Sequence, residues 1–130
     1  MTACDDFVER ELSESVIGAF LDSYYKLGFG FSERIYANAL ARELHKRRHT
    51  TQRETAVEVL YDGARIGWYR LDMIVDGRLV VEIKATETLP SHAQRQLLNY
   101  LRCTRLEVGL VLHYGPRPRF YRQVSSHHMG

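Results

Sequence analysis

The stretch YRLDMIVDGRLVVEIK, residues 69–84, decides the fold of this chain. Two runs rich in valine, isoleucine and leucine surround the pair Asp76-Gly77, and an Asp-Gly pair between two such runs is a strong signal for a β-hairpin. Because side chains alternate between the two faces of a strand, we expect one apolar face made of Leu71, Met73, Val75, Leu79, Val81 and Ile83. The polar side chains Asp72, Glu82 and Lys84 then lie together on the opposite face.

The register of this hairpin decides whether Asp72 and Glu82 meet. A plain two-residue turn at Asp76-Gly77 would place Asp72 opposite Val81, and a slip of one residue moves every side chain to the other face. A shared face requires an odd number of loop residues or a bulge. A three-residue loop with glycine in the left-handed conformation provides this, so we predict such a loop or bulge here.

The sequence on either side of the hairpin predicts helices and further strands. Apolar residues recur at the helical period before residue 50, and the period changes to two after it. The predicted helices cover residues 6–27, 32–48 and 91–104, and the predicted strands cover residues 55–61, 66–75, 78–85, 107–113 and 120–124. The first three strands form an antiparallel meander. This order, α-α-β-β-β-α-β-β, predicts a single domain over residues 1–124 and a disordered tail over residues 125–130.

The composition is that of a small globular protein. The 130 residues are 45% hydrophobic and 26% charged, which excludes a disordered chain, a coiled coil and a collagen-like repeat. No apolar run approaches the ~18 residues that a membrane helix needs, and the acidic amino terminus lacks the features of a secretory signal. The two cysteines have no metal-binding or redox spacing. We therefore expect a cytoplasmic protein with reduced thiols and no membrane partner, while the net charge of +2 argues neither for nor against nucleic acid.

The polar face of the hairpin indicates a metal site. Two neighbouring carboxylates repel each other unless a cation lies between them, and Mg²⁺ or Mn²⁺ prefers oxygen ligands. Lys84 lies on the same face, where it could orient or deprotonate a water molecule or stabilise charge on a phosphate. Asp72, Glu82 and Lys84 together suit metal-assisted hydrolysis of a phosphodiester bond. The alternative is a solvated strand face, which antiparallel sheets often have.

Further side chains could belong to the same site. Glu33 falls on the predicted buried face of its helix, where a carboxylate needs a partner or a metal; alternatively it points into solvent at the start of the helix. Gln96 and Tyr100 lie one helical turn apart, and they either hold a phosphate or a base or form an ordinary polar helix face. Trp68 and Tyr69 either stack on a base or pack in the core or at the sheet edge.

These motifs, taken in order, resemble the GxxExxY protein family. The segment from Gly30 to Tyr36 matches its Gly-x-x-Glu-x-x-Tyr signature, and residues 69–72, 80–85 and 96–101 are also similar to that family. The resemblance covers about residues 10–124. That family is assigned to the PD-(D/E)XK nuclease superfamily. The resemblance therefore implies an α/β, restriction-endonuclease-like core with a mixed central sheet flanked by helices in αβββαβ order.

The resemblance also implies roles for the site residues. Asp72 corresponds to the metal-binding acid of the superfamily, and Glu82-Ile83-Lys84 corresponds to its (D/E)-X-K triplet. Asp72, Glu82 and the carbonyl of Ile83 would bind Mg²⁺ or Mn²⁺, and Glu33 would do so directly or through water. Lys84 would position or activate the attacking water.

The function implied is that of a metal-dependent nuclease, with DNA as the expected substrate. In the resemblance Gln96 and Tyr100 contact the nucleic-acid backbone. A domain of this size could need a homodimer or a protein partner to choose its target. The alternative is a non-catalytic nucleic-acid-binding or protein-interaction module on a nuclease fold, since a fold alone does not establish activity.

Overall fold

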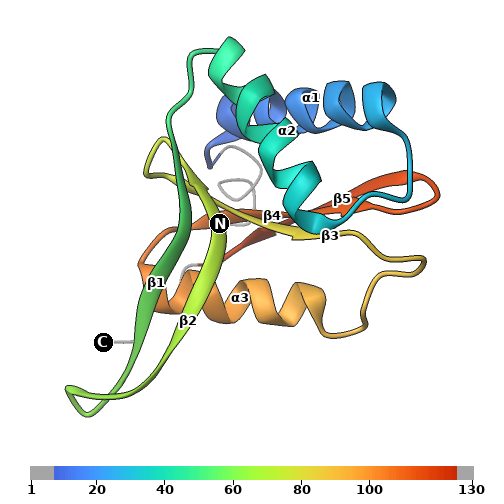
Figure 1. Cartoon of the computed structure of the whole chain (residues 1–130). Helices are drawn as coiled ribbons and strands as arrows, with labels where there is room; N and C mark the ends of the chain where they lie inside the picture. The colour runs from blue at the N-terminus through green and yellow to red at the C-terminus, as the bar shows by residue number, and fades with distance from the viewer. Residues whose placement is uncertain (1–7, 126–130) are drawn as a thin grey trace.

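Three helices and five strands make up the computed structural model, which describes residues 8–125 (Figure 1). The elements are α1 (Arg10–Leu27), α2 (Glu33–Lys46), β1 (Thr51–Tyr61), β2 (Ala64–Val75), β3 (Leu79–Lys84), α3 (Ala93–Thr104), β4 (Val108–Tyr114) and β5 (Pro118–Val124). Their order is the predicted one. Apart from Ser125, the predicted disordered tail lies outside the described residues. Within the described range, no helix is long and apolar enough to cross a membrane.

The strands form one mixed sheet in the order β1-β2-β3-β4-β5. β1, β2 and β3 are antiparallel neighbours, as the predicted meander requires, and β5 is antiparallel to β4. β3 and β4 are parallel, and a parallel pair needs a long crossover connection. α3 provides that crossover, so the mixed sheet with flanking helices confirms the predicted α/β class.

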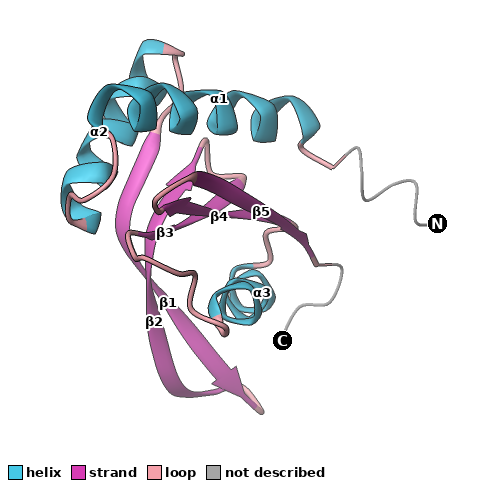
Figure 2. Ribbon diagram, turned by 90° about the vertical axis from the view of Figure 1, so that its right-hand side faces the viewer, coloured by secondary structure: helices cyan, strands magenta, loops and turns pink. Residues whose placement is uncertain are grey.

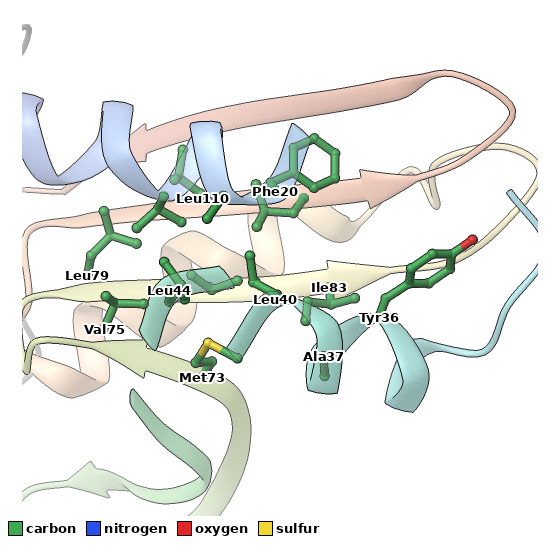
Figure 3. Packing of buried hydrophobic residues seen from close by; sticks show 14 of the residues in the cluster. Phe20, Tyr36, Ala37, Leu40, Leu44, Met73, Val75, Leu79, Ile83 and Leu110 are labelled. Atoms are coloured by element: carbon green, nitrogen blue, oxygen red, sulfur yellow. The ribbon is translucent and has the colours of Figure 1, made fainter. Parts of the chain in front are cut away.

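Helices cover both faces of the sheet. α1 and α2 pack on one face, where Phe20, Leu40 and Met73 belong to the larger apolar core (Figure 3). α3 packs on the other face, where Leu97 belongs to a second core with Val80. Figure 2 shows β3 and β4 between these two helical layers. Burial of each large apolar side chain in such cores contributes about 1.5–3 kcal/mol to folding.

The β2–β3 loop has the predicted odd length. Val75 pairs with Leu79, so residues 76–78 form a three-residue loop in which the φ of Gly77 is 66°. The backbone N–H of Arg78 donates to the carbonyl of Val75 at 2.9 Å. The prediction of a three-residue loop with left-handed glycine is confirmed, and this register directs Asp72 and Glu82 toward each other.

The predicted apolar face is wrong at Leu71. Leu71 belongs to the core on the α3 side, whereas Met73 belongs to the core under α1 and α2. The β1–β2 ladder is irregular between these two residues, because it pairs Arg53 with Met73 and Thr55 with Leu71 but does not pair the intervening residues. Glu54, the intervening residue of β1, has a φ of 51°. This irregularity breaks the alternation at Asp72, so Leu71 and Met73 direct their side chains to opposite faces although they are two residues apart.

Candidate active site

The carboxyl group of Asp72 lies at the point where β2 separates from β3. The ladder between the two strands ends at the pair Met73 and Val81. Beyond it, the carboxylate of Asp72 accepts the backbone N–H of Ile83 at 2.7 Å. The side chain of Asp72 thus occupies the place that the next backbone carbonyl would take in a continuous ladder, and it is held beside Glu82.

Glu82 is a buried acid in direct contact with a second acid. Its side chain is only 4% exposed. Burial, together with the hydrogen bond to Asp72 and repulsion from its charge, raises the pKa of Glu82 to about 9, while Lys84 and Tyr100 act in the opposite direction. At neutral pH Glu82 therefore keeps its proton and donates it to Asp72. A bound cation would replace this proton, because it removes the repulsion that keeps Glu82 neutral.

Tyr100 reaches the same carboxyl pair from α3. Its hydroxyl donates a hydrogen bond to Glu82, and burial is the main reason that the pKa of Tyr100 is raised. The ring packs edge-on against Tyr69 with 4.9 Å between the centroids. Gln96, one turn earlier, has a buried Oε1 with no hydrogen-bond partner among the described residues. α3 therefore brings both predicted side chains to the sheet, and their contact with nucleic acid stays a prediction.

Lys84 extends the site along β3. It is partly buried, and its charge is close enough to lower the pKa of Glu82. In the parallel ladder Lys84 pairs with His113 of β4, and Glu82 pairs with Val111. The structure thus brings Asp72, Glu82, Lys84 and Tyr100 together, as the sequence predicted for the first three.

Glu33 is not buried, contrary to the expectation that it lies on the buried face of its helix. It is the exposed first residue of α2, where Ser32 caps the helix by accepting the backbone N–H of Ile35 at 3.4 Å. A buried position is unavailable because the inward face of the first turn is taken by Tyr36. The hydroxyl of Tyr36 donates to the carbonyl of Gly28 at 2.5 Å and accepts the N–H of Phe31 at 3.2 Å, so it holds the loop that precedes Glu33.

Glu33 nevertheless borders the same cavity as Asp72. The cavity has a volume of about 370 Å³ and lies between the start of α2 and strands β1 to β3. Its lining residues are Glu33, Arg34, Ala37, Asn38, Arg53, Glu54, Asp72 and Ile83. Glu33 thus borders the cavity from the first turn of α2.

Comparison with known proteins identifies the family. A family model described as the PD-(D/E)XK nuclease superfamily matches residues 10–124. The chain belongs to this superfamily. A solved structure titled "Crystal structure of SSO0001" has 22% sequence identity and a TM-score of 0.58, which supports the fold alone. The match covers 94% of this chain and 60% of the other, so this chain spans about three fifths of that protein. No curated protein matches the chain significantly.

Members of the PD-(D/E)XK nuclease superfamily typically use Mg²⁺ or Mn²⁺, and the carboxyl pair fits such an ion. Among residues 8–125, no three His, Cys, Asp or Glu side chains gather closely enough to hold a metal ion by themselves. Mg²⁺ is usually held by one or two carboxylates, with water and substrate phosphates completing its shell. Asp72 and Glu82 are two adjacent carboxyl groups that would fit this requirement.

The sequence reasoning missed five of the eight residues that line the cavity, two of them from β1. Glu54 and Arg53 line it from β1, and the guanidinium of Arg53 donates to Asn38 at 3.0 Å. Their position follows from the register of β1 against β2 and from the irregularity at Glu54. No local pattern in the sequence reports either feature.

Proposed function

We propose that this protein is a Mg²⁺- or Mn²⁺-dependent nuclease that hydrolyses phosphodiester bonds in DNA. The observation that carries the proposal is the carboxyl pair formed by half-buried Asp72 and buried Glu82 beside Lys84. A buried acid held neutral by a second acid lowers the stability of the fold. Such a pair is expected where its role is to bind a cation. The family supports nuclease chemistry of this kind in general.

Each residue has a role that follows from its position. Asp72, Glu82 and the carbonyl of Ile83 would hold the metal ion, and Glu33 would reach it across the cavity, directly or through water. When bound, the ion supplies positive charge to the phosphate and lowers the pKa of a water molecule. Lys84 orients or deprotonates the attacking water.

Two residues of α3 complete the site. Tyr100 holds the carboxyl group of Glu82 in place through its hydroxyl. The amide NH2 group of Gln96 can donate to a phosphate oxygen, and we assign Gln96 and Tyr100 to the binding of the nucleic-acid backbone. Tyr100 is therefore a positioning residue for Glu82 as well as a substrate contact.

The test is metal-dependent cleavage. We expect the pure protein to cleave at least one of linear, circular and single-stranded DNA with Mg²⁺ or Mn²⁺ and not with EDTA, and RNA serves as the comparison substrate. Asp72→Ala and Glu82→Ala should each abolish cleavage, since metal ligands supply most of the catalysis. Glu14→Ala, which removes an exposed carboxylate on α1, is the matched control and should cleave like the wild type.

One pair of results would contradict the proposal. If no substrate is cleaved and calorimetry detects no divalent-metal binding, the protein is instead a non-catalytic module on a nuclease fold. Cleavage that survives in both Asp72→Ala and Glu82→Ala would place the activity elsewhere.

A further inference from the structure

The β1–β2 hairpin extends past α3 and leaves one of its faces uncovered. Figure 2 shows α3 against one side of this hairpin and no helix against the other. Val57, Tyr69 and Leu71 pack toward α3. Trp68 and Arg70 alternate with these residues along β2, so they lie on the uncovered face, and both are exposed.

Trp68 is unusually open to solvent for a tryptophan on a strand. Its side chain is 54% exposed, and the guanidinium carbon of Arg70 lies 6.0 Å from the centroid of its ring. The outer part of the hairpin exposes three more large apolar residues, Leu60, Tyr61 and Ile66. Exposed apolar side chains that gather among polar ones mark an interaction surface.

Trp68 and Arg70 lie on β2, the strand that carries Asp72 of the candidate active site. Arg70 precedes Asp72 by two residues on the same strand, and Trp68 precedes it by four. At roughly 3.3 Å per residue, Trp68 lies about 13 Å along β2 from Asp72. This distance corresponds to about four nucleotides at the stacked rise of ~3.4 Å, and to fewer in an extended strand.

We propose that this face binds an unpaired nucleotide of the substrate, with the base stacked on Trp68 and a phosphate on Arg70. The proposal rests on the proposed nuclease function and adds the substrate class: single-stranded nucleic acid, or a duplex with an unpaired end. The flat ring of a base is accessible to an aromatic side chain only when the base is unpaired and unstacked. An arginine beside an aromatic ring matches the alternation of phosphate and base along such a strand.

The uncovered face also contains an acidic residue, which provides a second test of the proposal. Glu58 pairs with Trp68 across the hairpin and is exposed. Its carboxylate would repel a phosphate that lies beside the stacked base. If nucleic acid binds here, Glu58→Gln should therefore strengthen the binding.

Because Trp68 is the only tryptophan of the chain, the tryptophan fluorescence of the protein reports directly on binding at this face. The wild-type protein is titrated in EDTA, so that no substrate is cleaved, with a mixed-sequence single-stranded DNA or with its blunt duplex. We expect saturable quenching of the tryptophan fluorescence by the single strand and much weaker quenching by the blunt duplex. A duplex with a single-stranded overhang should quench like the single strand.

Binding of the same labelled single strand to variants is then measured by fluorescence anisotropy. Trp68→Ala should weaken binding about 5- to 150-fold, the range expected for loss of one base–aromatic stack of about 1–3 kcal/mol. Arg70→Ala should weaken binding and reduce its salt dependence by about one phosphate contact. Tyr25→Ala removes a more exposed aromatic residue on α1, 74% open to solvent, and should bind like the wild type.

Three results would overturn the inference. The first is unchanged Trp68 fluorescence at saturating oligonucleotide, and the second is wild-type affinity in Trp68→Ala. The third is a wild-type dimer in sedimentation equilibrium that Trp68→Ala converts to a monomer, which would assign this face to a second copy of the chain. If the protein cleaves DNA with metal but Trp68→Ala cleaves and binds like the wild type, only this inference is refuted. If the single strand quenches Trp68 fluorescence but no metal condition gives cleavage, only the proposed nuclease activity is refuted.

Discussion

At the scale of single residues, Glu82 shows the conflict between stability and function most clearly. A glutamate on a central strand is expected to be exposed or paired with a cation, yet Glu82 is buried against Asp72. Its pKa of about 9 lies far above the ordinary value of 4.5. Between these two pH values the unfolded chain loses the proton and the folded chain keeps it, so the metal-free fold becomes less stable as the pH rises.

Replacing Glu82 by its neutral isostere should therefore stabilise the metal-free protein. Glutamine keeps a donor for Asp72 and an acceptor for Tyr100 but has no proton to lose. We expect Glu82→Gln to raise the free energy of unfolding at pH 7 in EDTA by about 3–4 kcal/mol, because each pH unit above 4.5 contributes about 1.4 kcal/mol, and the gain to vanish near pH 4. Urea unfolding across this pH range measures it. Mg²⁺ should stabilise the wild type and not Glu82→Gln, and a variant less stable than the wild type at pH 7 would contradict this account.

The hydroxyl of Tyr100 should affect the pH at which the site works. Its hydrogen bond lowers the pKa of Glu82, so Tyr100→Phe should raise that pKa further and make metal binding harder at neutral pH. We expect cleavage to fall about 10-fold at neutral pH, the lower end for loss of a group that supports a metal ligand, and to recover partly at higher pH. Tyr121→Phe on β5 is the matched control. A proportional loss at every pH would show that Tyr100 has no effect on the titration of Glu82.

At the scale of elements, the three-residue loop between β2 and β3 sets the register on which the site depends. The carboxylate of Asp76 accepts the backbone N–H of Thr50 at 2.8 Å and lies 2.7 Å from the Nδ1 of His49. The N–H of Asp76 in turn donates to the carbonyl of Thr50 at 2.9 Å. These contacts of His49 and Thr50 with Asp76, here called the clasp, hold the β2–β3 loop against the segment between α2 and β1.

This clasp predicts acid sensitivity. Burial by itself would raise the pKa of Asp76, but the hydrogen bonds from Thr50 and His49 outweigh it and lower the pKa below 3.8. A lowered pKa in the folded state gives stability that is present above the ordinary value and is lost as the pH falls through the folded value. We expect Asp76→Asn to cost about 1.5–3 kcal/mol at neutral pH and to differ little from the wild type in strong acid.

The second Asp-Gly turn offers a matched control for that substitution. Asp62 has a φ of 51°, close to the 53° of Asp76, and asparagine tolerates this conformation. Asp62 is exposed in the β1–β2 turn, so Asp62→Asn should leave the stability within about 0.5 kcal/mol of the wild type. Equal effects of both substitutions in thermal unfolding would assign the loss to the turn backbone instead of the clasp.

At the scale of the whole molecule, the two helical layers decide which strand positions are sites and which are core. α1 and α2 cover one face of the sheet and α3 covers the other, and the cavity of about 370 Å³ remains where α2 begins over β1 to β3. Glu33 reaches this cavity from a helix, and Asp72 reaches it from a strand. The hydroxyl of Tyr100 contacts Glu82 from the α3 side of the sheet.

The sequence by itself determined the order of the elements, the odd loop at residues 76–78 and the meeting of Asp72 with Glu82. These features depend on local rules, since alternation and turn chemistry act between residues that are close in the chain. Only the tertiary structure decided the change of face at Asp72, the exposure of Glu33, the contact of Tyr100 with Glu82 and the open position of Trp68. Each of these depends on how strands pair or on which helix packs against which strand, and such contacts join segments whose separation along the chain leaves no periodic signal.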